Sequence, residues 1–193
     1  MLFEGQSSNL LIYILQSILK FEGKIVAPSR EAWKAGESLI SIENLNGLTI
    51  DGNGQGGADG DGSTWWQCSG CQRPGVLHFH SCNDLSVSNI KITNSPRSHV
   101  SVNMCNGATF SHISIDSPPT SPNTDGFDIS FSSNILVKDS NIKSGDDCIA
   151  INGGSSFINA TGVTCGPGHG IRFINFFSRS KVQFHIYTIC IVT

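Results

Sequence analysis

The chain has 193 residues, of which 38% are hydrophobic and 14% are charged, and its formal net charge is −3. This size fits one ordinary domain with a buried core. The weak negative charge gives no support for a nucleic-acid partner, and the apolar run 10–15 is far shorter than the ~20 residues of a membrane span. We therefore expect no nucleic-acid partner and no membrane partner, and we expect a monomer.

Cysteine usage favours a disulfide-bearing, secreted protein. The chain has seven cysteines, and an odd number leaves at least one of them unpaired within the chain. Cys68 and Cys71 have a spacing that zinc sites use, but no second pair follows at metal-ligand spacing. Disulfides persist outside the cell, so we expect an extracellular protein. No signal peptide is visible, because Glu4 stands where a basic region belongs.

The first elements are predicted from hydrophobic spacing. In residues 7–20 apolar side chains fall at helical spacing, which predicts a helix, with a buried strand as the alternative. Residues 21–28 predict a short strand that ends at a proline. Residues 41–51 predict another strand, in which Leu48 and Ile50 alternate with polar residues.

Residues 51–62 are the most glycine-dense segment and predict a mobile loop. The start of this segment resembles a calcium-binding loop, but its twelfth position is Gly62 instead of the required glutamate. The two rings of Trp65 and Trp66 either pack in a core or stack on a sugar, and we favour the core.

A repeat begins after Cys82. Residues 83–92 match 106–115 position by position at an offset of 23, a looser copy at 133–143 follows after 29, and 160–164 follows after another 21. Apolar and small polar residues alternate in each copy, which is the period of strands. Asparagine, which tolerates tight bends, recurs just before the apolar pairs, at Asn46, Asn83, Asn106 and Asn134.

Periods of 20 to 30 residues with several short strands each are typical of a solenoid. We therefore predict an all-β fold, a parallel β-helix, over a barrel or sandwich, which needs no such period. We expect the β-helix to span 21–170, with an atypical N-terminal segment at 1–20 and an atypical hydrophobic tail at 171–193. The tail has no glycine and no acid, whereas the first 170 residues hold all 21 glycines.

Three polar clusters carry the chemistry: Asn123–Gly126, Gly145–Cys148 and Gly166–Gly170. Asp125 precedes Asp146 by 21 residues and Asp147 precedes His169 by 22, so the repeat places the clusters on adjacent coils. Neighbouring carboxyls share protons, so one of them should stay neutral at working pH. A neutral acid beside an ionised carboxylate is the pair that glycoside hydrolysis needs.

Single aspartates in solenoid turns are usually structural, and we assign Asp128 to that class. Four histidines fall among strand-like residues without acidic neighbours, and we expect them to be structural or exposed: His78, His80, His112 and His185.

At these clusters, and at residues 94–96 with His99, the chain resembles the polygalacturonases of glycoside hydrolase family 28, especially the plant-type ones. The likeness covers about 23–170. It implies a right-handed parallel β-helix that hydrolyses the α-1,4 bonds between galacturonates of de-esterified pectin with inversion. It also implies a cell-wall enzyme that needs no metal and no cofactor.

The resemblance implies a role for each matching residue. Asp146 corresponds to the general acid, Asp125 and Asp147 to the pair that holds and deprotonates the water, and His169 to the signature histidine. Asn123 and His99 fall where the family lines its substrate groove. Cys148 and Cys165 correspond to a disulfide that braces the site.

Two departures from the family stand out. The family supplies an Arg-Ile-Lys-type motif that grips the substrate carboxylate, and no such motif follows His169 here; Arg172 is a possible replacement. The chain also lacks the family's leader and first coil, so we expect a protein truncated at both ends.

Two other functions remain open. One is a catalytically inactive solenoid that binds pectin, for which the missing motif argues. The other is a calcium-dependent pectate lyase on the same fold, in which the clustered acids would hold the metal.

Overall fold

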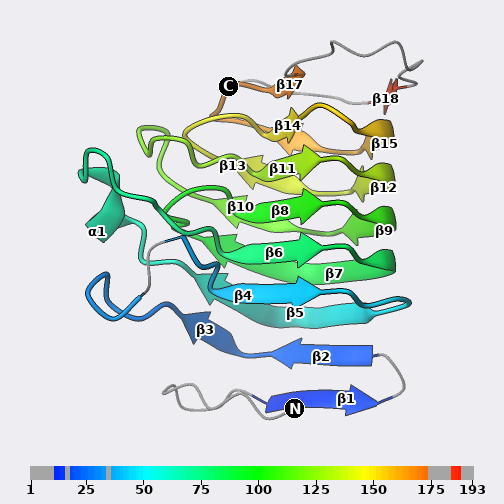
Figure 1. The fold of residues 1–193 in the computed structure, drawn as a ribbon, viewed down its shortest axis with the longest axis horizontal. Coiled ribbons are helices and arrows are strands. Elements are labelled where there is room, and N and C mark those ends of the chain that lie inside the picture. The colour runs from blue at the N-terminus through cyan, green and yellow to red at the C-terminus, as the bar shows by residue number, and fades with distance from the viewer. Residues whose placement is uncertain (1–10, 16–17, 34–35, 174–183, 188–193) are drawn as a thin grey trace.

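The computed structural model describes residues 11–15, 18–33, 36–173 and 184–187. Within these residues the chain forms one four-residue helix and a series of short strands (Figure 1). The elements are β1 (Leu11–Leu15), β2 (Ile18–Glu22), β3 (Lys24–Val26), β4 (Ile40–Glu43), β5 (Thr49–Asp59), α1 (Ser63–Trp66), β6 (Leu77–His80), β7 (Asn83–Thr93), β8 (Val100–Asn103), β9 (Asn106–Ser111), β10 (Ser114–Asp116), β11 (Phe127–Ser130), β12 (Ser133–Lys138), β13 (Asn141–Lys143), β14 (Ile149–Ile151), β15 (Ser156–Thr161), β16 (Thr164–Cys165), β17 (Ile171–Phe173) and β18 (Phe184–Tyr187).

The strands stack into a right-handed parallel β-helix, as predicted (Figure 1). One sheet has the order β17-β14-β11-β8-β6-β4, and we call it the groove sheet because it carries the groove described below. The other sheet runs from β1 to β18 and branches, so that β3, the second half of β5 and of β7, β10, β13 and β16 form a third face. Every described pairing is parallel except β1 with β2.

Tight corners with left-handed backbone join the faces. Positive φ angles recur at the same register on successive coils, because a left-handed residue turns the chain within one step. One set is Ser81, Met104 and Phe131; a second is Gly47, Asp84, Gly107, Asn134 and Phe157; a third is Asn89, His112, Asp139 and Gly162. The asparagine pattern therefore marks the second set. Asn46, Asn83 and Asn106 stand one residue before the bend, whereas Asn134 is the bend itself.

The core lies inside the coils and consists of stacked apolar side chains. One row runs through Phe79, Val102, Ile129 and Ile151, which are all buried and in register. The ring of Phe110 packs edge-on against Phe79 and Phe127, with centroids 5.6 and 5.3 Å away. Identical inward positions on each coil thus build a continuous interior, as expected for a solenoid.

Two local predictions are wrong. The described part of 7–20 forms antiparallel strands β1 and β2 instead of a helix, because pairing with a neighbouring strand outweighs the helical spacing. The glycine-rich 51–62 segment lies largely in β5 instead of a loop. Its glycines permit close packing: a Cβ on Gly57 would lie 2.8 Å from the carbonyl oxygen of Lys91 on the next coil.

The register of the later coils also corrects the repeat. The offset of 23 between β7 and β9 is confirmed by the pairing of Asn83 with Asn106. The next two steps pair Ser133 with Asn106 and Ser156 with Ser133, which gives offsets of 27 and 23 instead of 29 and 21. An error of two residues leaves every side chain on the same face of a strand, so the same residues still face the interior.

The cysteines and tryptophans settle the remaining local choices. Cys68 and Cys71 form a disulfide, and so do Cys148 and Cys165. Cys82 and Cys105 are free and buried, while Cys190 lies outside the described residues. Trp65 is buried against Trp33, which confirms core packing for that ring, while Trp66 is partly buried. No helix in the described ranges is long and apolar enough to cross a membrane.

Candidate active site in the groove

A groove of about 1120 Å³ crosses the outer surface of the groove sheet. Its floor includes one outward-facing residue from almost every strand, and the register places these in a single row: Ser41, His78, Ser101, Asp128 and Arg172. Its wall comes from the loops that precede the same strands and carry Asn123, Asp125, Asp146 and Asp147. These loops lie at the left of Figure 1, on the same side as α1. The groove therefore runs across the coils and can hold an extended chain.

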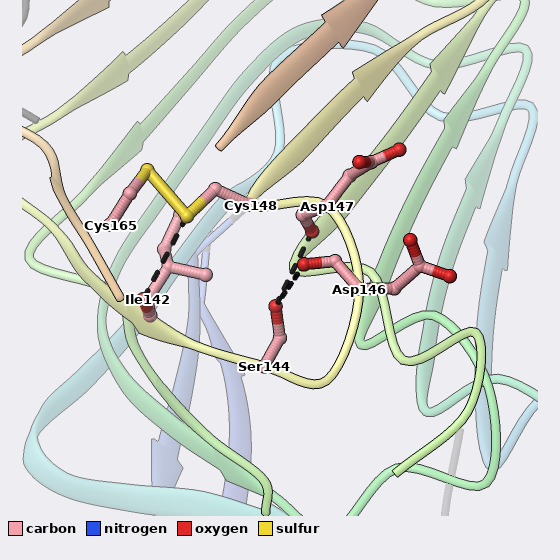
Figure 2. The surroundings of a disulfide bond; sticks show 6 residues. All are labelled: Ile142, Ser144, Asp146, Asp147, Cys148 and Cys165. Carbon is pink, nitrogen blue, oxygen red and sulfur yellow. Dashed lines mark hydrogen bonds between the residues drawn. A yellow bond between two sulfur atoms is a disulfide. The ribbon is translucent and has the colours of Figure 1, made fainter. Parts of the chain in front are cut away.

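Three of the predicted residues occupy equivalent positions on successive coils. The amide of Gly126 donates to the carbonyl of Asp147, and that of Cys148 donates to the carbonyl of Gly170, with N···O distances of 2.8 and 2.7 Å. Asp125, Asp147 and His169 are thereby stacked one above another, and Asp146 stands one residue earlier. The Gly-Asp-Asp-Cys cluster points both carboxyls away from the Cys148–Cys165 disulfide (Figure 2).

Asp146 lies between an amide and an imidazole. Its Oδ1 is 3.0 Å from Nδ1 of His169, and its Oδ2 accepts a hydrogen bond from Nδ2 of Asn123 at 3.3 Å. The orientation of that amide follows from its other partner, because Arg73 donates to Asn123 Oδ1 at 2.5 Å and a guanidinium can only donate. Arg73 thus helps to aim the amide N–H of Asn123 at Asp146.

Asp147 is the most enclosed of the carboxylates, with a side chain only 2% exposed. Its Oδ2 is 3.5 Å from Nε of Arg172, and its Oδ1 accepts no hydrogen bond from the residues that the structure describes. Burial raises the pKa of Asp147, and the positive charge of Arg172 opposes that rise. The carboxyl therefore has one buried oxygen without a hydrogen-bond donor, and its basicity is above that of an ordinary aspartate.

Asp125 retains a proton at mildly acidic pH. Burial, followed by the charge of Asp146, raises the pKa of Asp125 to about 7. Because these carboxyls interact, the proton belongs to the cluster and can move within it. The prediction that one acid is held neutral thus agrees with this pKa.

His99 is completely buried, although we expected it to line the groove. Its Nδ1 is 2.9 Å from the carbonyl oxygen of Asp125, and its Nε2 is 2.7 Å from Oγ of Ser117. Both ring nitrogens therefore contact protein, and the side chain lies behind the groove. Its placement does not fit direct contact with a substrate.

Glycines let the loops approach one another. A Cβ on Gly145 would collide with the carbonyl oxygen of Ser121, and the amide of Gly145 donates to Oγ1 of Thr124 at 3.0 Å. A Cβ on Gly126 would likewise collide with the backbone of Cys148. Close backbone approach of this kind needs a residue without a side chain.

Three arginines line the groove, and sequence reasoning named only Arg172. Arg73 and Arg97 belong to other loops, and their charges reach this site only after the chain has coiled. Arg73 donates to the carbonyls of Pro122 and Pro96 at 2.6 and 3.3 Å, while Arg97 lies close enough to Asp128 to oppose the rise that burial causes in its pKa. The position of Arg97 directly after the 94–96 motif was the sequence signal that could have predicted its place in the groove.

Asp128 also differs from its predicted structural role in one respect. It lines the groove, it accepts a hydrogen bond from Asn152, and burial raises its pKa. His78 lines the groove as well, and burial lowers its pKa. Of the predicted site residues, Asn123, Asp125, Asp146, Asp147 and His169 meet at one place, and His99 supports them from the interior.

The side chains that meet here fit proton transfer better than they fit a calcium ion. One atom each from Asp146, Asp147 and His169 lie within 4.8 Å of one another, which is compatible with a small cation. Calcium, however, takes 6–8 oxygen ligands, and here one ligand is an imidazole and the guanidinium of Arg172 stands beside a second. The residues present do not fit the metal that a pectate lyase would need.

Known proteins are similar to this chain in both sequence and fold. The model of the glycosyl hydrolases family 28 matches residues 10–178. A probable polygalacturonase of Arabidopsis thaliana is 42% identical over 170 residues, which cover 88% of this chain and 36% of that protein. A polygalacturonase of Persea americana is 39% identical and covers 79% of this chain and 35% of its own length. The chain thus spans about a third of these two relatives.

Solved structures agree with the sequence relatives. An endo-xylogalacturonan hydrolase from Aspergillus tubingensis has a TM-score of 0.74 at 27% identity, over 79% of this chain and 44% of that one. A polygalacturonase from Erwinia carotovora has a TM-score of 0.62 at 26% identity, over 80% of this chain and 49% of that one. The chain therefore belongs to glycosyl hydrolase family 28.

Proposed function

We propose that this chain carries the catalytic centre of a polygalacturonase, which hydrolyses α-1,4 bonds between galacturonates in de-esterified pectin. The observation that carries the proposal is the convergence of Asp125, Asp146 and Asp147 in a groove that crosses the coils. A protonated and an ionised carboxyl at one glycosidic bond are sufficient for hydrolysis. The named activity of the relatives supports pectin as the substrate.

Asp146 donates the proton to the leaving oxygen. Its two oxygens lie between Asn123 and His169, and the carboxylate that forms when the proton leaves is stabilised by the amide N–H of Asn123 and by His169 in the form that carries a hydrogen on Nδ1. The raised pKa of Asp125 keeps a proton in the cluster at mildly acidic pH, and transfer of that proton to Asp146 supplies the acid and leaves Asp125 ionised.

Asp125 and Asp147 hold and deprotonate the attacking water. Asp147 lines the groove, and its raised pKa makes it a stronger base than an ordinary carboxylate. Attack from the face opposite the leaving oxygen inverts the anomeric configuration. The inversion is a proposal that the family membership supports.

The arginines bind the carboxylates of the substrate. Arg73, Arg97 and Arg172 place three positive charges along the groove next to the acids. A guanidinium pairs well with a carboxylate, so these side chains can hold the galacturonate units that flank the cleaved bond. They offer a cationic lining where the Arg-Ile-Lys-type motif is missing from the chain.

The assembly state and the location of the protein are part of the same proposal. We propose that the protein acts as a monomer on pectin in the cell wall, outside the cell. The Cys68–Cys71 and Cys148–Cys165 disulfides support an oxidising compartment. The boundaries at residues 20 and 170 stay a prediction, although strands β2 and β17 of the outer segments pair within the two sheets.

The experiment is the release of reducing ends from polygalacturonate at mildly acidic pH. Wild type should release them, and the product should have the inverted anomeric configuration by NMR. An unsaturated product that absorbs in the ultraviolet and a loss of activity with a chelator would instead show a lyase. Binding to pectate without any bond cleavage would show an inactive pectin-binding protein.

A further inference from the structure

The side chain of His99 is buried against the loop that carries Asp125. His99 has no exposed surface, and it stands directly before β8, one coil below Asp125. Its backbone amide and its Nδ1 both lie 2.9 Å from the carbonyl oxygen of Asp125. Its Nε2 lies 2.7 Å from Oγ of Ser117, which is buried at the beginning of the same loop.

The chemistry of the two partners defines the protonation state of the ring. A carbonyl oxygen can only accept, so Nδ1 must carry the hydrogen that points at Asp125. Burial lowers the pKa of His99 to about 4, so the ring is neutral at the mildly acidic pH where the site works. In this tautomer Nε2 accepts from the hydroxyl of Ser117.

The ring therefore joins the two ends of the loop 117–125. Between those ends the loop is held by its own hydrogen bonds, in which Oγ of Ser121 lies 2.6 Å from Oγ1 of Thr124. Thr124 in turn accepts from the amide of Gly145, which directly precedes Asp146. The contacts form a continuous connection from His99 through the first cluster to the second.

We propose that His99, with Ser117 as its partner, is a positioning residue that fixes the loop 117–125 and so sets the placement of Asp125 against Asp146 and Asp147. The side chain of His99 contacts neither the groove nor the carboxyl groups of the acids. It acts through the backbone oxygen of Asp125, and a small rotation of that peptide moves the carboxyl. The activity readout of this inference rests on the proposed function, whereas the titration of Asp125 does not.

The test compares two variants at this contact with one matched control. Ser117→Ala removes the hydroxyl alone. His99→Asn places an amide nitrogen near the position of Nδ1, so it can still donate to Asp125, but it loses the contact with Ser117. Ser132→Ala is the control, because Ser132 is equally buried and has its own network of backbone hydrogen bonds, but it lies in a distant corner of the coil.

We measure kcat and KM on polygalacturonate, the Tm, and the titration of the Asp125 carboxyl by carbon NMR. In both Ser117→Ala and His99→Asn, we expect kcat to fall about ten- to a hundredfold with KM nearly unchanged, because misplacement of a reacting group by about 1 Å has such an effect. The pKa of Asp125 should move away from about 7. Ser132→Ala should lower the Tm about as much as Ser117→Ala does, without changing kcat or the pKa of Asp125.

Wild-type kcat and an unmoved Asp125 titration in Ser117→Ala and His99→Asn would overturn the inference, and so would an equal loss of kcat in Ser132→Ala. If wild type cleaves no polygalacturonate, the proposed function fails, and the titration alone decides this inference. A shifted Asp125 pKa then still supports positioning, and an unshifted one refutes it.

Discussion

The tight corners of the β-helix and the loops before the groove sheet make the same kind of turn by different means. At the corners, single residues with left-handed backbone, such as Met104, recur in register. Their backbone groups form hydrogen bonds with those of the next coil. In the loops, ionisable side chains bind one another across coils, as His169 does with Asp146, whereas corner contacts such as that of Asn134 with Asn106 join amides. The corners maintain the repeat, whereas the loops depart from it and carry ionisable groups. Substitutions in the two regions should therefore separate stability from activity.

Among the substitutions that compare the loops with the corners, the largest expected effect is at a loop glycine. In Gly145→Ala the new methyl group meets the carbonyl of Ser121, so the loops bearing Asp125 and Asp146 must separate. We expect kcat to fall about a hundredfold, because a shift of about 1 Å in the reacting groups has that cost. Steady-state kinetics on polygalacturonate would measure it. Activity within twofold of wild type would show that the loop contact does not set the acid geometry.

Asp125→Asn tests how much stability the site costs. The folded protein holds a proton on Asp125 up to about pH 7, whereas an unfolded aspartate releases it near 3.8. Between these values the folded state binds more protons, so the contribution of Asp125 to stability falls as the pH rises. Asparagine does not titrate. The free energy of unfolding of the variant relative to wild type should therefore rise from pH 4 to 7, by at most about 1.4 kcal/mol per pH unit.

Denaturant unfolding of both proteins at several pH values gives that difference. A difference that stays constant across the range would contradict the raised pKa. Ser132→Ala, which removes a buried hydroxyl outside the groove and no titrating group, is the control for general destabilisation.

A smaller effect is expected at the β4 end of the groove. Glu37 and Glu43 line that end, opposite in charge to the arginines nearer the acids. A galacturonate carboxylate bound there meets negative charge, so Glu43→Gln should lower KM for oligogalacturonates by about two- to fivefold at low salt and less at high salt. Kinetics at two salt concentrations checks this. An unchanged KM at low salt would place the substrate elsewhere.

The smallest effect is expected at a corner. Met104 has a φ of 54° and a side chain that is 55% exposed on the surface. Met104→Gly removes the strain of a left-handed non-glycine residue, which is worth about 1 kcal/mol. We expect a modest rise in the Tm and unchanged kcat. A loss of kcat in this variant would break the separation between corners and loops.

The sequence predicts the coils well because each coil repeats its apolar positions, and a two-residue error in offset leaves the faces unchanged. The described part of 7–20 and the segment 51–62 were predicted wrongly, because helical spacing and glycine content are local signals that strand pairing overrides. The acids were predictable because they lie one coil apart. Arg73 was not, because it contacts Asn123 from 50 residues away. The burial of His99 likewise depends on how the loop 117–125 folds over it.

The leaving-group dependence of Asp146→Asn shows whether Asp146 is the proton donor of the site. If Asp146 is the proton donor, the variant loses cleavage of polygalacturonate by about 10²–10⁴-fold. It should keep much of its activity on a galacturonide whose leaving group, such as nitrophenolate, needs no proton. Asp147→Asn, which removes the proposed base, should lose both activities. Equal losses of Asp146→Asn on both substrates, or polymer cleavage at the wild-type rate, would contradict the assignment of Asp146 as the acid.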